Sequence, residues 1–234
     1  MLSVQSDNGE HQGISMTDDI RELASRAAKI ATATFANALD DFGLAEACIL
    51  PTIKSVAPGM RCAGPAVTIL ESVGAPGTYT SADFRVGAII DAASPGDVIV
   101  IAGSGENVST FGGMASFASK KKGIAGLVAD IGVRDVEEMV EFEFPVFAKH
   151  LTPLTGRTRL KVEAIGETIE VDGISVSPGD IIVADGTGVV VLPKDKAAEI
   201  IANAEIYSAD DAAAIKDLDT GLTFSEAMAK YTRI

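Results

Sequence analysis

Cysteine and histidine are scarce in this sequence, which has two of each among its 234 residues. Cys48 and Cys62 are too few for a disulfide framework or a cysteine-rich zinc site, so we expect a reduced, intracellular pair. His11 and His150 lack the paired spacing of zinc ligands, and His11 lies in a polar leader. Neither a zinc site nor a hydrolase triad containing histidine is therefore favoured.

Long apolar runs and basic clusters are also missing. No apolar run approaches the roughly 20 residues that cross a bilayer, and the first 15 residues lack the apolar core of a signal peptide. The net charge is -14, and the longest basic cluster is Lys120–Lys122, which is too short to follow a phosphate backbone. We expect a cytoplasmic protein without membrane or direct nucleic-acid partners, preceded by a disordered leader at residues 1–15.

The overall composition is that of a globular protein, with 47% hydrophobic and 22% charged residues. The chain is long enough to bury one large core, and no linker rich in proline, serine or charge divides it. We therefore expect a single domain at residues 16–234. An acidic domain that binds a carboxylate must overcome its own field locally, which a metal ion or an arginine can do.

Helical and strand patterns alternate along the first two thirds of the chain, which favours parallel βαβ units. Short strands separated by glycine-containing turns follow Thr155, and helices end the chain. The predicted fold class is α/β, a layered α/β/β sandwich with C-terminal helices. Helices are expected at residues 17–30, 33–41, 81–93, 113–122, 136–141, 195–207 and 224–231. Strands are expected at residues 62–70, 124–129, 145–148, 161–165, 168–171, 174–176 and 188–192, in addition to the repeated segment below.

One short pattern occurs twice. Residues 94–103 read SPGDVIVIAG and residues 177–186 read SPGDIIVADG. Each copy predicts a Pro-Gly turn that leads into a buried apolar strand. The match is too short to indicate a repeat protein.

Candidate ligand-binding residues cluster between Gly112 and Asp135. A helix start and a loop after a neighbouring strand are expected to meet there, at the edge of the sheet where α/β proteins bind ligands. Gly112 and Gly113 would leave backbone N–H groups uncovered at a helix N-terminus, where they attract carboxylate or phosphate. A tight turn before a helix explains the same glycines.

The pair Arg134-Asp135 has two interpretations. Asp135 can bind Mg²⁺ together with water and substrate oxygens, and Arg134 offers a planar fork to a carboxylate or an enolate. Alternatively, Asp135 caps a helix with Glu138 as its capping-box partner, and Arg134 pairs with the acidic surface. The residues alone leave both open.

An ordered set of short motifs between about Ala38 and Ala204 resembles the RraA-like family. That family includes 4-hydroxy-4-methyl-2-oxoglutarate aldolases, RraA regulators of ribonuclease E, and chains labelled demethylmenaquinone methyltransferase. A methyltransferase is not favoured here because no glycine-rich cofactor loop is recognisable. The motifs are GPAVT at 64–68, PGDVIV at 95–100, GGMA at 112–115, GIAGLV at 123–128, GVRD at 132–135, PVFA at 145–148 and PGDIIVAD at 178–185.

The resemblance implies a fold like the swivelling phosphohistidine-type domain, assembled as homotrimers or hexamers with sites between subunits. It implies that Arg134 is the catalytic, enolate-stabilising and substrate-binding arginine, and that Asp135 binds the divalent cation, Mg²⁺ or Mn²⁺. The backbone cradle for the substrate carboxylate would be formed by Gly112, Gly113, Met114 and Ala115.

Three positions depart from the family's pattern. Gly113 stands where an acidic or amide side chain usually orients metal-bound water, and Ile131 stands where glycine usually follows the aspartate. The family's distal glutamate from a neighbouring subunit has no clear counterpart, and Asp210 or Asp211 is the nearest candidate.

The resulting expectation is a class II, metal-dependent lyase. It would cleave a 4-hydroxy-2-oxo acid to pyruvate by a retro-aldol reaction, decarboxylate oxaloacetate, or do both. The alternative is a non-catalytic, protein-binding regulator of the RraA type. Specificity for the distal half of the substrate is expected from the loop around Ala75 to Ser81 and from the neighbouring subunit.

Overall fold

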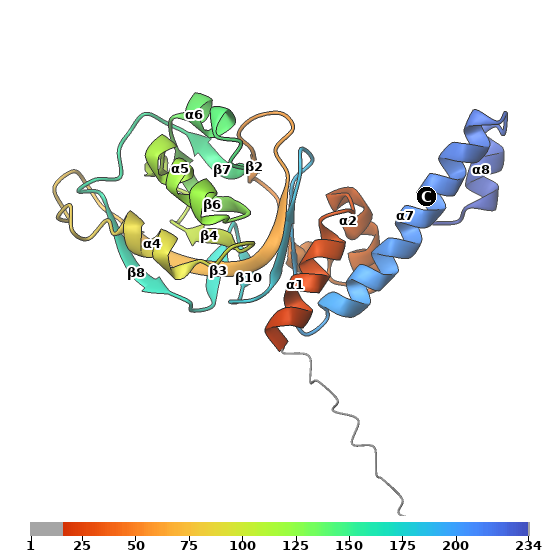
Figure 1. Cartoon of the computed structure of the whole chain (residues 1–234), viewed down its shortest axis with the longest axis horizontal. Helices are drawn as coiled ribbons and strands as arrows, with labels where there is room; N and C mark the ends of the chain where they lie inside the picture. Colours follow the sequence, from red (N-terminus) through yellow and green to blue (C-terminus); the bar gives the residue numbers. More distant parts are fainter. Residues whose placement is uncertain (1–15, 234) are drawn as a thin grey trace, which may run out of the picture.

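The structure, a computed structural model, describes residues 16–233, and the leader expected at residues 1–15 lies outside them. Helices and strands alternate as the sequence predicts (Figure 1). The helices are α1 (Met16–Ala27), α2 (Thr32–Asp41), α3 (Ala45–Cys48), α4 (Val86–Ala92), α5 (Gly113–Lys122), α6 (Val136–Glu141), α7 (Ala197–Asp219) and α8 (Phe224–Lys230). The strands are β1 (Ile49–Leu50), β2 (Lys54–Ser55), β3 (Cys62–Val73), β4 (Val98–Ala102), β5 (Ser109–Phe111), β6 (Gly126–Val133), β7 (Val146–Leu151), β8 (Leu160–Ile165), β9 (Ile169–Val171), β10 (Ile174–Val176), β11 (Ile181–Ala184) and β12 (Val189–Leu192).

A mixed sheet forms the centre of the described chain. Its strands follow the order β1-β12-β11-β3-β4-β6-β7-β2, with β8 paired to β3 and β5 paired to β6. Strands β3, β4, β6 and β7 are parallel neighbours, and α4, α5 and α6 lie between them in sequence. The predicted βαβ units and the α/β class with C-terminal helices are therefore confirmed. The likeness to a swivelling phosphohistidine domain stays a prediction.

Helices cover the sheet in two groups. Helices α4, α5 and α6 lie over the parallel strands, whereas α1, α2 and α7 pack beside β11 and β12 (Figure 1). Strands β4, β6, β11 and β12 are buried along their whole length. This explains the continuous apolar runs of β4, β11 and β12, because a strand covered on both faces has no polar side. The core thus fixes β6, the strand that leads to the candidate site.

The repeated Pro-Gly pattern forms the same turn twice. In each copy the aspartate, Asp97 or Asp180, accepts a hydrogen bond of 2.7 Å from the backbone N–H of the serine three residues earlier. The glycine has a positive φ, 84° at Gly96 and 86° at Gly179, as a type II turn requires after proline. Strands β4 and β11 follow these turns and flank β3 on its two sides. The prediction of two buried strands is confirmed.

Three element boundaries differ from the predictions by four residues or more. The helix expected at residues 81–93 begins at Val86, because Arg85 adopts a left-handed conformation with φ of 39°. Strand β6 continues past Ala129 to Val133 because β5 pairs with its last residues. Helix α7 continues past Tyr207 to Asp219 through an alanine-rich segment with high helix propensity.

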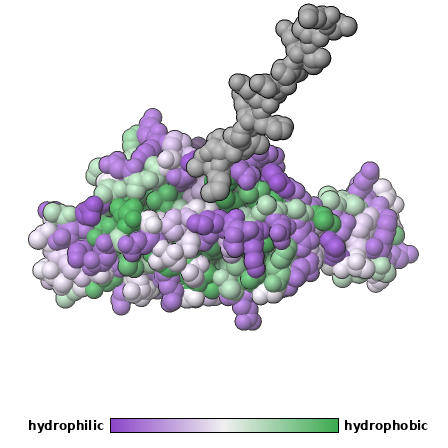
Figure 2. Space-filling model, turned by 90° about the horizontal axis from the view of Figure 1, so that it is seen from below, coloured by the Kyte–Doolittle hydropathy of each residue, from purple (hydrophilic) through white to green (hydrophobic). Residues whose placement is uncertain are grey.

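Helices α7 and α8 form an arm that projects from the body (Figure 1). The end of the arm also stands clear of the body in the space-filling view (Figure 2). Thr223 and Glu226 form a capping box that starts α8. None of the helices within residues 16–233 has the length and apolarity needed to cross a membrane.

Both cysteines are free and buried, as the sequence suggests. Burial raises the pKa of the Cys62 thiol to about 12, because the thiolate would lose its hydration. Cys62 is therefore protonated at neutral pH, and a nucleophilic role for it is not supported.

Candidate active site

The candidate site lies where two parallel strands end side by side. Strand β5 pairs in parallel with the end of β6, and each strand leads within three residues into a helix, α5 or α6. The backbone N–H of Arg134 donates a hydrogen bond of 3.0 Å to the carbonyl of Phe111, which joins the two strand ends. The structure thus brings Gly112 and Gly113 next to Arg134 and Asp135, as the strand order predicts.

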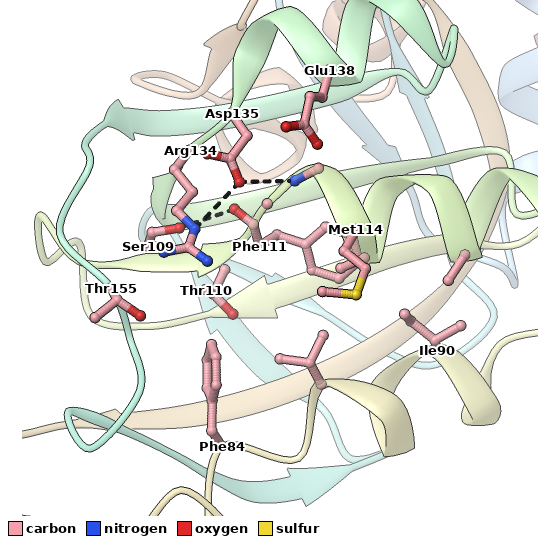
Figure 3. A pocket seen from close by; sticks show the side chains of 15 residues that line it. Phe84, Ile90, Ser109, Thr110, Phe111, Met114, Arg134, Asp135, Glu138 and Thr155 are labelled. Atoms are coloured by element: carbon pink, nitrogen blue, oxygen red, sulfur yellow. Dashed lines mark hydrogen bonds and ion pairs between the residues drawn. The ribbon is translucent and has the colours of Figure 1, made fainter.

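A cavity of about 500 Å³ opens at this point, which is a suitable size for a small-molecule ligand. Phe84 and Ile90 lie on one side of it, and Arg134, Asp135 and Glu138 lie on the other (Figure 3). The cavity is lined by Phe84, Val86, Ile90, Ser109, Thr110, Phe111, Gly112, Gly113, Met114, Ala115, Ala118, Arg134, Asp135, Glu138 and Thr155. All six site residues that the sequence predicted are among them.

Asp135 faces the cavity and does not cap its own helix. It precedes α6 in a left-handed conformation, φ 60° and ψ 46°, and makes no side-chain capping bond. Its Oδ2 atom instead accepts a hydrogen bond of 3.1 Å from the backbone N–H of Gly113 (Figure 3). The capping-box interpretation of Asp135 and Glu138 is therefore wrong. Aspartate tolerates this conformation better than most residues, but it is still strained, and such strain is concentrated at functional sites.

Arg134 lies beside this carboxylate. Its Nε atom is 3.4 Å from the Oδ2 atom of Asp135, and the two side chains are 44% and 39% exposed. The pair is therefore open to solvent and to a ligand. A contact this exposed contributes little to stability.

Gly112 and Gly113 leave room for neighbouring acidic side chains. A Cβ on Gly112 would lie 2.6 Å from the Oδ2 atom of Asp135, and a Cβ on Gly113 would overlap the carboxylate of Glu138. Gly112 has φ of -145°, a conformation open to any residue. These glycines therefore do more than form a turn, because they let acidic side chains approach the backbone.

The N-terminus of α5 contributes backbone donors. Gly113, Met114 and Ala115 form its first turn and line the cavity, and N–H groups of a first turn have no acceptor within the helix. Asp135 already accepts from Gly113. The predicted carboxylate cradle therefore depends mainly on the N–H groups of Met114 and Ala115, and its occupation by substrate stays a prediction.

The charged side chains of the cavity wall suit a hard divalent cation. Arg134, Asp135 and Glu138 are the charged residues among those that line it. No group of three or more His, Cys, Asp or Glu residues within residues 16–233 could enclose a metal ion. Mg²⁺ does not need such a cage, because it keeps several waters and commonly uses one or two carboxylates. Two carboxylates in an open cavity fit that requirement, with Asp135 as the candidate ligand.

A buried glutamate lies behind the cavity wall. Glu71 is 2% exposed, and its Oε1 atom accepts a hydrogen bond of 2.9 Å from the hydroxyl of Thr110, a cavity-lining residue. Its Oε2 atom has no partner within the described residues. Burial raises the pKa of Glu71 to about 8, against which the Thr110 hydrogen bond acts. No motif in the sequence singles out Glu71, and the only signal for it is a charge next to the apolar residues of β3.

Asp130 and Ile131 are buried in β6 and do not line the cavity. Asp130 lies inside β6 at 5% exposure, and its carboxylate accepts hydrogen bonds from the backbone N–H groups of Gly103 and Asp172, at 2.7 Å and 3.2 Å. Ile131 is fully buried and packs against Gly103, whose notional Cβ would lie 2.5 Å from it. Ile131, which stands where the family usually has glycine, is therefore a core residue.

Two other predicted contributions lie elsewhere. Asp210 and Asp211 are on α7, on the far side of the body from α5 and α6 (Figure 1). Residues 75–81 contribute no lining side chain, and Phe84, Val86 and Ile90 line that side of the cavity instead. The expectation that this loop and a neighbouring subunit set specificity for the distal half of the substrate stays a prediction.

A cavity at the carboxyl ends of parallel strands is typical of α/β proteins that bind small ligands. The profile of the RraA-like family, described as Aldolase/RraA, matches residues 32–191. The chain belongs to this family.

Three known proteins illustrate the similarity. An uncharacterized protein of Methanocaldococcus jannaschii is 43% identical over 109 residues, which are 46% of this chain and 52% of that protein, so the match spans about half of the relative's length. A protein of Halalkalibacterium halodurans named "Putative 4-hydroxy-4-methyl-2-oxoglutarate aldolase" is 32% identical over 79% of this chain and 82% of its own length. The crystal structure of Streptomyces coelicolor RraAS2, described as an unusual member of the RNase ES inhibitor RraA protein family, has a TM-score of 0.69 at 26% identity and covers 86% of this chain and 96% of its own.

Proposed function

We propose that this protein is a lyase that forms pyruvate from a 2-oxo acid with the help of Mg²⁺ or Mn²⁺. The substrate would be a 4-hydroxy-2-oxo acid, cleaved by a retro-aldol reaction, or oxaloacetate, which is decarboxylated. The observation that carries the proposal is the orientation of Arg134 and Asp135, which face the cavity beside the N-terminus of α5. The aldolase name of the Halalkalibacterium halodurans relative supports the same reaction class.

Both reactions place the same demand on the site. The bond between C3 and C4 breaks, and its electron pair becomes part of an enolate whose negative charge lies on the C2 oxygen. In the retro-aldol reaction the C4 hydroxyl gives its proton to water and C4 leaves as a carbonyl, whereas in the decarboxylation C4 leaves as carbon dioxide. Protonation at C3 then gives pyruvate in both cases, so one enolate-stabilising site can serve both.

Arg134 and α5 supply the groups for this demand. The guanidinium of Arg134 can donate hydrogen bonds to the developing enolate oxygen, and preorganised donors of this kind are worth about 2.7–4 kcal/mol each. The N–H groups of Met114 and Ala115, at the positive end of α5, can bind the C1 carboxylate. A divalent cation held by Asp135 would act as a Lewis acid toward the keto group. Phe84 and Ile90 offer an apolar wall to the carbon chain.

A pyruvate-release assay tests the proposal. The purified protein is supplied with Mn²⁺ and either oxaloacetate or 4-hydroxy-4-methyl-2-oxoglutarate, and pyruvate is followed with lactate dehydrogenase. We expect release by the parent and at least a hundredfold loss in the variants Asp135→Ala and Arg134→Ala. Release by the parent no faster than from either acid with Mn²⁺ alone, or equal rates in the parent and both variants, would overturn the assignment.

We further propose that the chain assembles with copies of itself, as a homotrimer or hexamer. The arm of α7 and α8 carries Ile206, Ile215, Phe224 and Met228, which are 45% to 67% exposed. Exposed apolar side chains gathered on a projecting element are typical of an interface. Met114, 85% exposed at the cavity, would be covered if a second copy closes over the site.

The alternative function is a non-catalytic regulator that binds a protein partner. The Streptomyces coelicolor structure, from a family named for an RNase ES inhibitor, favours it. A regulator has no need for a cation beside Arg134. A protein that binds no Mn²⁺ and releases no pyruvate, but stays folded, would support the regulator.

A further inference from the structure

Glu138 is the second acidic side chain of the cavity wall, and the lyase mechanism above gives it no role. It lies in the first turn of α6, three residues after Asp135, and its carboxylate lies over the backbone of Gly113. Within residues 16–233, neither of its oxygens accepts a hydrogen bond or pairs with a basic side chain. Its carboxylate is therefore available to a ligand.

The two carboxylates converge on one stretch of backbone. The Oδ2 atom of Asp135 accepts from the N–H of Gly113, and the Oε2 atom of Glu138 fills the space that a side chain on the same residue would take. Standard backbone dimensions place these oxygens within roughly 7 Å of each other. A hydrated divalent cation is large enough to contact both, one directly and one through water.

The charge of the wall favours a cation. Its charged side chains are two carboxylates and the single guanidinium of Arg134, which lies 3.4 Å from Asp135. Glu138 thus adds a negative charge that no basic residue of the wall balances. A bound divalent cation would balance it.

We propose that Glu138 is a cation-positioning residue: its carboxylate occupies the space that Gly113 leaves free and from there holds the hydrated cation against Asp135. The inference rests on the proposed function, since it assigns a further residue to the same site. It also gives Gly113 a purpose, because any larger residue there would displace Glu138.

A purely structural role makes a different prediction. An acidic residue in the first turn of α6 stabilises the helix through its dipole without any ligand. In that case Glu138→Gln would lower the melting temperature and leave cation affinity unchanged. Glu137→Gln is a matched control, because Glu137 is in the same first turn and does not line the cavity.

The experiment measures Mn²⁺ affinity by electron paramagnetic resonance in the parent, Glu138→Gln, Glu137→Gln and Asp135→Asn. We expect Glu138→Gln to raise the Kd for Mn²⁺ about tenfold or more, as loss of a supporting carboxylate does in other metal sites, and Glu137→Gln to change it less than twofold. Equal affinities of the two glutamine variants would overturn the inference. If the two affinities are equal but the parent releases pyruvate with Mn²⁺, the proposed lyase function stands and only the role of Glu138 is wrong. If the parent neither binds Mn²⁺ nor releases pyruvate, the lyase function and the role of Glu138 are both wrong.

A relocated carboxylate provides a second measurement. Glu138→Gly removes the whole side chain, including the Cβ that would lie 2.9 Å from a Cβ at position 113, so Gly113→Asp can be added to it. We expect this double variant to bind Mn²⁺ more tightly than Glu138→Gly alone. If the double variant binds Mn²⁺ no more tightly than the single variant, the inference is contradicted, because a carboxylate beside Asp135 would then not affect cation binding.

Discussion

The backbone N–H of Gly113 and the Oδ2 atom of Asp135 are joined by a hydrogen bond of 3.1 Å between the first residue of α5 and the residue that precedes α6. This bond turns the carboxylate away from its own helix and toward the N-terminus of the neighbouring one. It places Asp135 on the cavity wall beside Arg134, open to solvent. The consequences for cation binding and for catalysis can be tested separately.

Gly112→Ala should impair the site while leaving the fold intact. The added Cβ would lie 2.6 Å from the Oδ2 atom of Asp135, so the carboxylate must move, although the backbone conformation suits alanine. We expect about a tenfold or greater rise in the Kd for Mn²⁺ and a matching loss of pyruvate release. The measurements are isothermal titration calorimetry and the coupled assay.

Gly87→Ala is the control for this change. Gly87 lies in α4, and its notional Cβ meets nothing within 4 Å. Alanine there should raise the free energy of unfolding by up to about 1 kcal/mol and leave Mn²⁺ affinity unaltered. A Gly112→Ala variant as active as Gly87→Ala would show that Asp135 does not need this position.

Arg134→Lys should slow the reaction more than it weakens cation binding. Lysine keeps the charge but loses the planar fork that can donate to an enolate and a carboxylate together. We expect a loss of about a hundredfold in kcat, with the Kd for Mn²⁺ within a factor of three. Arg157→Lys, which changes an exposed arginine bonded to Ser81, should behave as the parent in the same assays. If Arg134→Lys retains the parent's kcat, the guanidinium does not stabilise the enolate.

Glu71 should make stability depend on pH. Its carboxyl has a pKa of about 8 in the folded chain and an ordinary value of 4.5. Below about pH 4.5 both states hold the proton, whereas between there and about pH 8 folding takes up a proton. The free energy of unfolding is therefore expected to fall as pH rises through this window, by at most about 1.4 kcal/mol per pH unit.

Glu71→Gln removes this dependence because glutamine does not titrate. Urea unfolding of the parent and the variant at several pH values between 4.5 and 8 measures the effect. The variant should gain stability relative to the parent as pH rises. A constant difference between the two, as expected for the exposed change Glu137→Gln, would show that Glu71 is ionised in the fold.

Charges on the arm of α7 and α8 should disrupt self-association. Ile215 and Phe224 are each 67% exposed, and glutamate at both positions would oppose burial in an interface. Light scattering after size-exclusion chromatography should show a smaller assembly for Ile215→Glu/Phe224→Glu than for the parent. Lys216→Glu adds negative charge to the same helix at a polar residue and should leave the assembly intact. An unchanged mass in the double variant would exclude the arm as the interface.

Local patterns in the sequence predicted much of the fold. The limits of α5 and α6 agree with the structure, because glycine turns and the start of apolar periodicity mark them. The repeated Pro-Gly-Asp turns were also predicted, since their geometry depends on adjacent residues. The end of β6 was predicted too early, because its last residues are held in the sheet by pairing with β5. The sequence around a strand does not show which other strand pairs with it.

The candidate site, too, could be predicted from the sequence only in part. Local sequence was enough to predict that Arg134 and Asp135 follow the buried strand β6 and that two glycines mark the start of α5. The bond from Gly113 to Asp135, in place of a cap on α6, and the position of Glu138 over Gly113 follow only from the packing of the chain. A helix cap and a bond to a neighbouring helix offer a carboxylate similar hydrogen bonds, so the choice between them depends on how β5 and β6 place the two helix N-termini.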